Sequence, residues 1–144
     1  MKAQLTADLA QLLEIKKELL AKMLEAIKRS AMALSRDDMD AFSAEMEGCK
    51  GITAAVDELG ITETSLRAQI PDVQQQPAII KMDSGIQYIL EQSERARREC
   101  NDIAQQKLRV YGQQIKAVRH TKRGIDGYAN QFQHRDAVFI DAKK

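Results

Sequence analysis

The chain has 144 residues, of which 44% are apolar and 4% aromatic, and it contains no tryptophan. Two prolines and seven glycines are too few for the many tight turns of a sheet protein, while the helix formers Ala, Leu, Glu, Lys and Gln dominate. With 22 basic and 21 acidic residues the net charge is +1, which gives the whole chain no drive toward nucleic acid or anionic membranes.

Residues 5–34 are predicted to form an amphipathic helix, because their apolar residues recur at intervals of three and four. This stripe is wider than the seam of a two-stranded coiled coil, which favours a bundle. Its members are Leu5, Leu9, Leu12, Leu13, Leu19, Leu20, Met23, Leu24, Ile27 and Leu34.

Residues 35–38 read either as a helix restart or as an irregularity within one continuous helix. Ser35 is a candidate N-cap, and the aspartates after it suit the positive end of a helix dipole. The apolar pattern then continues to Leu59, and Gly60 is the predicted C-cap. Gly48 and Gly51 lie within this segment and indicate either a close helix crossing or a weak point.

Residues 61–77 are predicted to be mainly a connector, with Pro77 in the first turn of the next helix. That helix is predicted over residues 78–119 and ends at the Thr-Lys-Arg-Gly stretch of residues 121–124. Its middle, EQSERARRE, is poor in apolar groups, so a packing partner there must approach closely or leave the helix partly solvated. Its apolar stripe contains Ile79, Met82, Ile86, Ile89, Leu90, Ser93, Ala96, Cys100, Ile103, Leu108, Tyr111, Ile115 and Val118.

These elements predict an all-α fold: an elongated antiparallel helical hairpin or bundle of two long helical arms, folded back near residues 60–77. Residues 1–120 form the predicted bundle domain, and residues 121–144 a flexible tail that binds a partner. The tail holds Tyr128, Phe132, Phe139 and Ile140. These side chains either fold back onto the bundle or contact a partner, and we favour a partner because the helices look sufficient without them.

The groups that enzymes need are scarce in this sequence. His120 and His134 are the only histidines, and neither has a catalytic partner at a fixed spacing. No phosphate-binding loop, zinc spacing or nucleophile motif is present, and the aspartates near residue 38 suit a helix start better than a metal site. Cys49 and Cys100 lie on apolar stripes and are predicted to be buried reduced thiols. We expect no enzyme activity, no catalytic residue, no metal and no cofactor.

What remains is a surface for another protein. If the first arm ends early, Ile103, Leu108, Tyr111, Ile115 and Val118 present an open face that could hold a partner helix; otherwise they belong to the core. Basic residues form one cluster at residues 95–98, with acidic residues within a turn. A second cluster, less compensated, could steer an acidic partner or nucleic acid; it contains Lys116, Arg119, Lys122 and Arg123.

Three segments carry a family resemblance: LLEIKKELLAKMLEAIKRSAMAL, SRDDMDAFSAEMEGCKGITAAVDELG and ILEQSERARRECNDIAQQKLRVYGQQI. Together with the tail GIDGYANQF, they resemble the FlgN-type flagellar export chaperones, and the related FliT-type chaperones remain an alternative. The resemblance implies a cytoplasmic α-helical protein that binds hook–filament junction proteins before type III secretion. It also implies that the C-terminal helix and tail cover the amphipathic C-terminal helices of this cargo.

Two other function classes stay open at this point. A scaffolding coiled-coil protein would dimerise through its long helices, so a homodimer is possible. A nucleic-acid or regulatory binder would rest on the second basic cluster, although we expect no nucleic acid as partner. The N-terminus lacks a signal peptide, and no stretch approaches the roughly 20 apolar residues of a membrane span. We therefore expect a cytoplasmic protein without membrane insertion.

Overall fold

The structure, a computed structural model, describes the backbone of residues 1–125 and the side chains of residues 1–120. Three α-helices, α1 (Lys2–Ser35), α2 (Met39–Gln69) and α3 (Pro77–Ile125), are joined by short turns, and a 3₁₀ helix, η1 (Val73–Gln75), precedes α3. No strand occurs within residues 1–125, so the predicted all-α fold is confirmed. The chain divides into two units, Met1–Ala104 and Gln105–Lys144, and the division falls inside α3.

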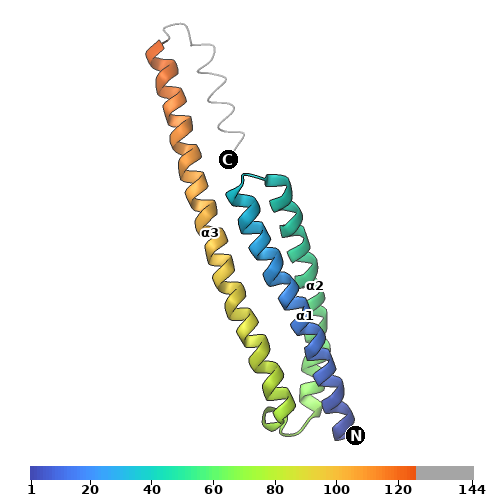
Figure 1. Cartoon of the computed structure of the whole chain (residues 1–144). Coiled ribbons are helices and arrows are strands. Elements are labelled where there is room, and N and C mark those ends of the chain that lie inside the picture. The colour runs from blue at the N-terminus through green and yellow to red at the C-terminus, as the bar shows by residue number, and fades with distance from the viewer. Residues whose placement is uncertain (126–144) are drawn as a thin grey trace. The chain divides into compact units, whose positions relative to one another are not determined.

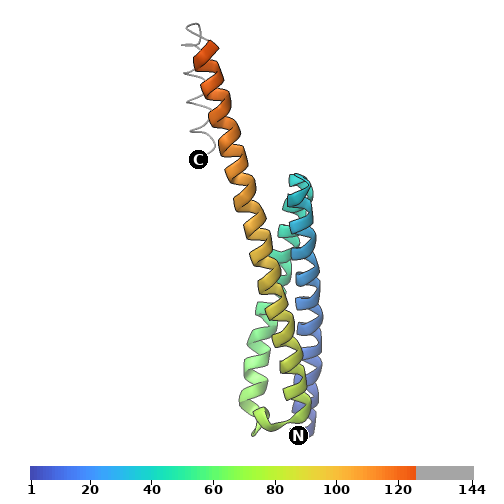
Figure 2. The same cartoon turned by 60° about the vertical axis from the view of Figure 1, so that its left-hand side comes forward.

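Unit Met1–Ala104 is a bundle in which the chain reverses twice. Helix α2 runs back along α1, and the first half of α3 then runs along both (Figure 1). The turned view places the connection between α2 and α3 at the same end of this unit as the N-terminus (Figure 2). The predicted helical bundle is therefore confirmed. The predicted first arm is itself a hairpin of two helices, so the helix-restart reading of residues 35–38 is the right one.

The first reversal uses hydrogen bonds of the backbone rather than a glycine or a proline. Asp38 N donates to Ala33 O at 2.9 Å, and Asp37 N donates to Leu34 O at 3.1 Å. This pair of bonds is the Schellman pattern, in which the residue after the C-cap is left-handed. Asp37 takes that role with φ of 58°, a conformation that aspartate tolerates better than most residues. The chain can therefore reverse its direction here without a glycine or a proline.

Asp38, not the predicted Ser35, is the N-cap of α2, and Ser35 is the last residue of α1. The Asp38 carboxylate accepts a hydrogen bond from Ala41 N at 3.1 Å, which satisfies one of the free donors of the first turn.

Substituting the cap, Asp38→Ala, should lower the free energy of unfolding by about 1 kcal/mol, because the first turn of α2 loses its acceptor and a nearby negative charge. Urea unfolding followed by circular dichroism measures this change. Asp57→Ala is the matched control, since Asp57 is an exposed residue of the same helix. Equal losses in the two variants would contradict the capping role.

Helix α2 continues nine residues beyond the predicted C-cap Gly60 and ends at Gln69. It continues because its inward-facing positions keep the spacing of three and four through Glu63, Leu66 and Ile70. Of the two readings of Gly48 and Gly51, a close helix crossing or a weak point, the close crossing is wrong. A Cβ placed on either glycine would meet nothing within 4 Å, so neither marks a close approach of helices.

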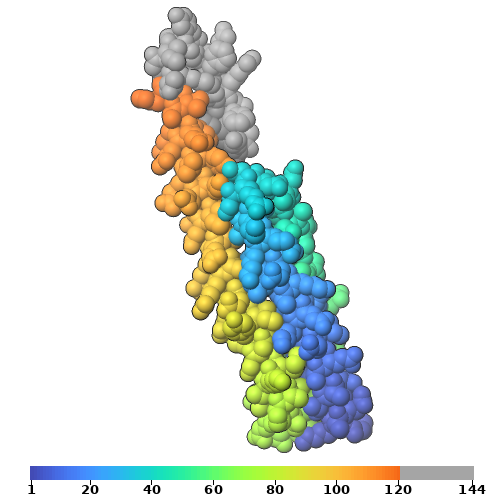
Figure 3. Space-filling view, in the orientation of Figure 1, coloured from blue at the N-terminus to red at the C-terminus, as the bar shows by residue number. Residues whose placement is uncertain are grey.

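The core of unit Met1–Ala104 follows a heptad pattern. Helix α1 is the central element and contributes most of the buried side chains, while α2 has none of its own. Yellow atoms of α3 lie against blue atoms of α1 in the space-filling view (Figure 3). The core cluster contains Leu9, Leu12, Leu13, Leu20, Met23, Ile27, Ile70, Ile79, Ile86 and Ala96. Ser93 is 3% exposed and Ala96 7%, so small residues let the apolar-poor middle of α3 pack closely.

A chain of charged side chains links the three helices of this unit. Lys16 Nζ of α1 lies 2.8 Å from Glu63 Oε1 of α2, and Arg67 Nε lies 2.9 Å from Glu63 Oε2. Arg67 Nη2 also lies 2.7 Å from Asp83 Oδ1 of α3. Burial alone would raise the pKa of Glu63, but the hydrogen bonds and charges of Lys16 and Arg67 outweigh it and leave this pKa below its ordinary value.

The connector between α2 and α3 is shorter than predicted and spans residues 70–76. Asp72 adopts φ of 57° at its start, and η1 leads into Pro77, the first residue of α3 as predicted. Helix α3 ends at Ile125, one residue beyond the predicted stop. The predicted flexible tail lies outside the described residues from position 126 onward.

Candidate partner-binding surface

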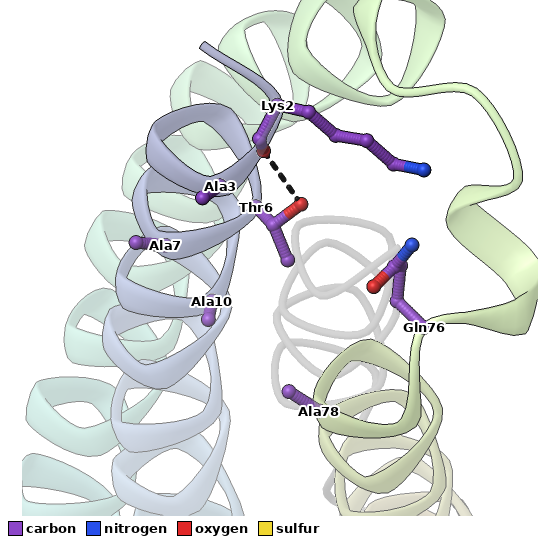
Figure 4. A pocket seen from close by; sticks show the side chains of 7 residues that line it. All are labelled: Lys2, Ala3, Thr6, Ala7, Ala10, Gln76 and Ala78. Carbon is purple, nitrogen blue, oxygen red and sulfur yellow. Dashed lines mark hydrogen bonds between the residues drawn. The ribbon is translucent and has the colours of Figure 1, made fainter.

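One hollow lies in unit Met1–Ala104, between the first turns of α1 and the start of α3 (Figure 4). Its volume is about 630 Å³, and four of its seven lining residues are alanines. The Thr6 hydroxyl donates to Lys2 O at 2.9 Å, and Gln76 and Lys2 supply the other polar groups. Lys2 is the one charged residue in its lining.

A second hollow, of about 280 Å³, contains the predicted site residue Ile103. It lies between α1 and α3, with Met32 and Ala96 among its lining residues. Ile103 is half-buried and belongs to unit Met1–Ala104, whereas the other predicted residues of α3 belong to unit Gln105–Lys144. Ile103 therefore belongs to the bundle unit and not to the unit that holds the other predicted residues of α3.

The titratable groups of the described chain form no reactive constellation. Within residues 1–120 no group of three or more His, Cys, Asp or Glu could hold a metal ion. Cys49 and Cys100 are free and half-buried, rather than fully buried as predicted. Burial raises the pKa of both thiols, and the Glu45 carboxylate raises that of Cys49 further, so both stay protonated near neutral pH.

The part of α3 in unit Gln105–Lys144 carries an apolar stripe that lies largely in solvent. Leu108 is 70% exposed, Tyr111 45% and Val118 54%, while Ile115 is half-buried. Their spacing of three, four and three residues places all four on one side of the helix. We call these four residues the distal stripe. A stripe of this kind on a stable helix fits the apolar face of a second helix.

The distal stripe is not a continuation of the seam that packs the bundle. That seam repeats every seven residues, for example at Ile86, Ser93 and Cys100, and its next position is Lys107. The apolar residue is instead Leu108, and the same shift by one residue separates Ile115 from position 114. One residue is about 100° of rotation around a helix. Leu108 and Ile115 are therefore rotated away from this row of the seam, whereas the other row, Ile89, Ala96 and Ile103, continues at Val110, which is 41% exposed.

A row of basic side chains runs along one edge of the distal stripe. Arg109, Lys116 and Arg119 follow one another at helical spacing, with Gly112 between the first two. Arg109 and Lys116 are exposed and Arg119 is half-buried. None of the three forms an ion pair with any residue of the described chain. We call these three residues the basic row.

The other basic cluster, at residues 95–98, behaves as predicted. Arg98 Nε lies 3.5 Å from a Glu94 oxygen and Arg97 Nη1 lies 4.0 Å from the other, so two of its three arginines are paired within the surface. The contrast with the basic row is clear in the sequence, because residues 103–125 hold six Lys or Arg and no Asp or Glu. Residues 1–104 hold thirteen basic and eighteen acidic residues. The sequence reading missed Arg109, although the absence of acids around it was the available signal.

The remaining predicted site residues cannot be placed. Tyr128, Phe132, Phe139 and Ile140 lie outside the described residues, as do Lys122 and Arg123 so far as their side chains are concerned.

Two further findings bear on classification. Among the described residues, no helix combines the length and the apolar character needed to cross a bilayer. The chain matches no family model, no curated protein and no solved structure with which it was compared.

Proposed function

We propose that this protein is an export chaperone of the flagellar type that captures an amphipathic helix of its cargo. The cargo is a hook–filament junction protein, as the resemblance to FlgN-type chaperones implies. The observation that carries the proposal is the distal stripe, four apolar side chains at helical spacing, of which Leu108, Tyr111 and Val118 are exposed. A cytoplasmic chaperone of this kind needs such a face and needs no reactive group.

The physical role of capture is to cover an apolar stripe that would otherwise self-associate. An isolated amphipathic helix exposes its apolar face to water, and covering each Å² of that face contributes about 25 cal/mol. A helix laid against Leu108, Tyr111, Ile115 and Val118 would be anchored at positions one turn apart. Capture keeps the cargo soluble until secretion, and release restores the stripe for a new molecule.

The test uses labelled peptides that span the C-terminal helices of hook–filament junction proteins encoded in the source genome. Their binding to the full chain is measured by fluorescence anisotropy, with the bundle's melting followed separately. We expect saturable binding to these peptides, and none to a helix of the same composition whose apolar residues are scrambled. Equal binding of the scrambled peptide, or no binding of either, would rule out the proposal.

Removal of residues 121–144 tests whether the tail takes part. The truncated chain should keep a nearly unchanged circular dichroism spectrum and lose cargo binding, because Tyr128, Phe132, Phe139 and Ile140 leave with the tail. If the truncated chain captured cargo at full affinity, the predicted role of these four tail residues would be wrong, and the distal stripe would bind the cargo without them.

A further inference from the structure

We propose that the helix captured by the distal stripe is acidic along one edge, so that its carboxylates meet the basic row. This inference rests on the proposed function and names the chemistry of the partner. The two features lie side by side on the same part of α3, with Leu108 next to Arg109 and Val118 next to Arg119. A helix that covers the stripe therefore brings one of its own edges against the row.

The three cations of the basic row form no ion pair within the described chain. Arg109, Lys116 and Arg119 have no ion pair with any described residue, whereas Arg97 and Arg98 share Glu94. A partner carboxylate at helical spacing would give each cation a charge-assisted contact at the rim of an apolar interface. Acidic residues beside an apolar stripe set the orientation and the choice of partner in paired helices.

The same charges argue against a second copy of this chain as the occupant. Residues 103–125 carry six positive and no negative side chains, so two such segments side by side would repel each other. An acidic helix has the opposite relation, since opposite charges speed encounter and suppress wrong partners.

Nucleic acid and an anionic membrane fit the observations less well. The row borders a stripe of apolar side chains, which do not bind phosphate groups. The eighteen acidic residues of unit Met1–Ala104 also outnumber its thirteen basic ones and repel a polyanion. A membrane-surface helix buries a broad apolar face at the lipid headgroups. Here the polar residues Lys107 and Gln114 border the distal stripe on its other edge, so the apolar face is narrow.

The probes are three synthetic helical peptides that share one apolar stripe and differ only along one edge, which carries Glu, Gln or Lys. Anisotropy titrations of the full chain should rank their affinities Glu above Gln above Lys. The advantage of the Glu peptide should shrink between roughly 50 mM and roughly 500 mM salt, because salt screens exposed charges. Equal affinity for the Glu and Lys peptides would overturn the acidic edge while leaving helix capture intact. Failure of all three to bind would overturn the proposed function as well.

The variant Arg109→Gln, Lys116→Gln, Arg119→Gln tests the basic row itself. It should bind the Glu peptide roughly tenfold more weakly, as expected for three exposed ion pairs together, and bind the Gln peptide unchanged. An unaltered ranking of the three peptides in this variant would overturn the assignment of the row.

The matched control removes the same number of charges elsewhere, at Arg95, Arg97 and Arg98, and should keep the wild-type ranking. Vesicles of equal parts phosphatidylcholine and phosphatidylserine, and a single-stranded oligonucleotide, are titrated alongside. Tighter binding of either one than of the Glu peptide, lost when the basic row is changed, would overturn the acidic helix as the occupant.

Discussion

The double substitution Leu108→Ala, Ile115→Ala should weaken capture of an amphipathic helix by roughly 100-fold or more, without destabilising the bundle. Apolar anchors of a helix interface each cost about 2 kcal/mol of binding free energy when truncated, and these two lie seven residues apart on the distal stripe. Alanine keeps the helix propensity of α3, so the loss reports contact rather than unfolding. Peptide titration by anisotropy gives the affinity, and circular dichroism melting gives the stability.

The control for this experiment is another pair of exposed apolar residues. Ile61 is 76% exposed and Tyr88 is 62% exposed, and both lie in unit Met1–Ala104. Ile61→Ala, Tyr88→Ala removes a comparable apolar area without touching the distal stripe. It should leave peptide affinity within about twofold of the parent. A loss as large in this control would mean that apolar exposure in general, not the distal stripe, holds the helix.

The independence of binding and stability follows from where the core lies. The fully buried side chains Leu9, Leu13 and Ile79 belong to unit Met1–Ala104, and no described residue of unit Gln105–Lys144 is buried. The apolar side chains of the distal stripe therefore add little to the folding energy of the bundle. An exposed apolar stripe lowers solubility and contributes favourable free energy only when a partner covers it.

The helices themselves could be predicted from the sequence, because amphipathic periodicity is a local property. The spacing of Leu9, Leu13 and Leu20 predicts α1, and Pro77 predicts the start of α3. The exposed character of Leu108 and Val118 also follows from the sequence, given a first arm that ends early.

The two chain reversals were harder to predict, because they depend on contacts that the local sequence pattern does not indicate. At residues 36–38 the left-handed residue is Asp37 rather than glycine, so the usual turn signal is missing. At Gly60 a glycine does occur, but the helix continues past it. There the inward position is Glu63, a charge that breaks the apolar pattern and is stabilised by Lys16 of α1 together with Arg67. Such a pairing between residues far apart in sequence cannot be read from periodicity.

The basic row shows a similar limit for the binding surface. A count of charges identifies residues 103–125 as basic, yet whether those charges are paired depends on neighbours in space. Arg97 and Arg98 look equally basic in sequence and are paired with Glu94, while Arg109 and Lys116 have no described ion-pair partner. The difference became visible only with the side chains in place.

Neutralising the linking glutamate, Glu63→Gln, should lower the free energy of unfolding by about 1 to 2 kcal/mol at pH 7. The Glu63 side chain is 14% exposed, and its partners Lys16 and Arg67 are 22% and 26% exposed. These groups are less exposed to solvent than a surface ion pair, which contributes at most about 1 kcal/mol. They are more exposed than a buried ion pair, which costs about 3 to 5 kcal/mol to break. The substitution also leaves two cations facing an uncharged amide.

The pH dependence of this loss follows from the lowered pKa of Glu63. A glutamate whose folded pKa lies below its ordinary value of 4.5 stabilises the fold at higher pH and loses that contribution as the pH falls through the folded pKa. The stability difference between parent and Glu63→Gln should therefore be full near pH 7 and shrink below about pH 4.5. Urea unfolding at a series of pH values measures the difference.

Glu14→Gln provides the baseline, since Glu14 is exposed and forms no ion pair with a described residue. Its free energy of unfolding should match the parent across the pH series. Glu45→Gln should fall between the two variants, because Glu45 pairs with Arg29 at 2.9 Å but the guanidinium is 57% exposed. A loss at Glu63 that stayed constant down to low pH would assign its contribution to packing rather than charge. The side chains that link α1 through Glu63 and Arg67 to Asp83 would then stabilise the bundle through packing contacts alone.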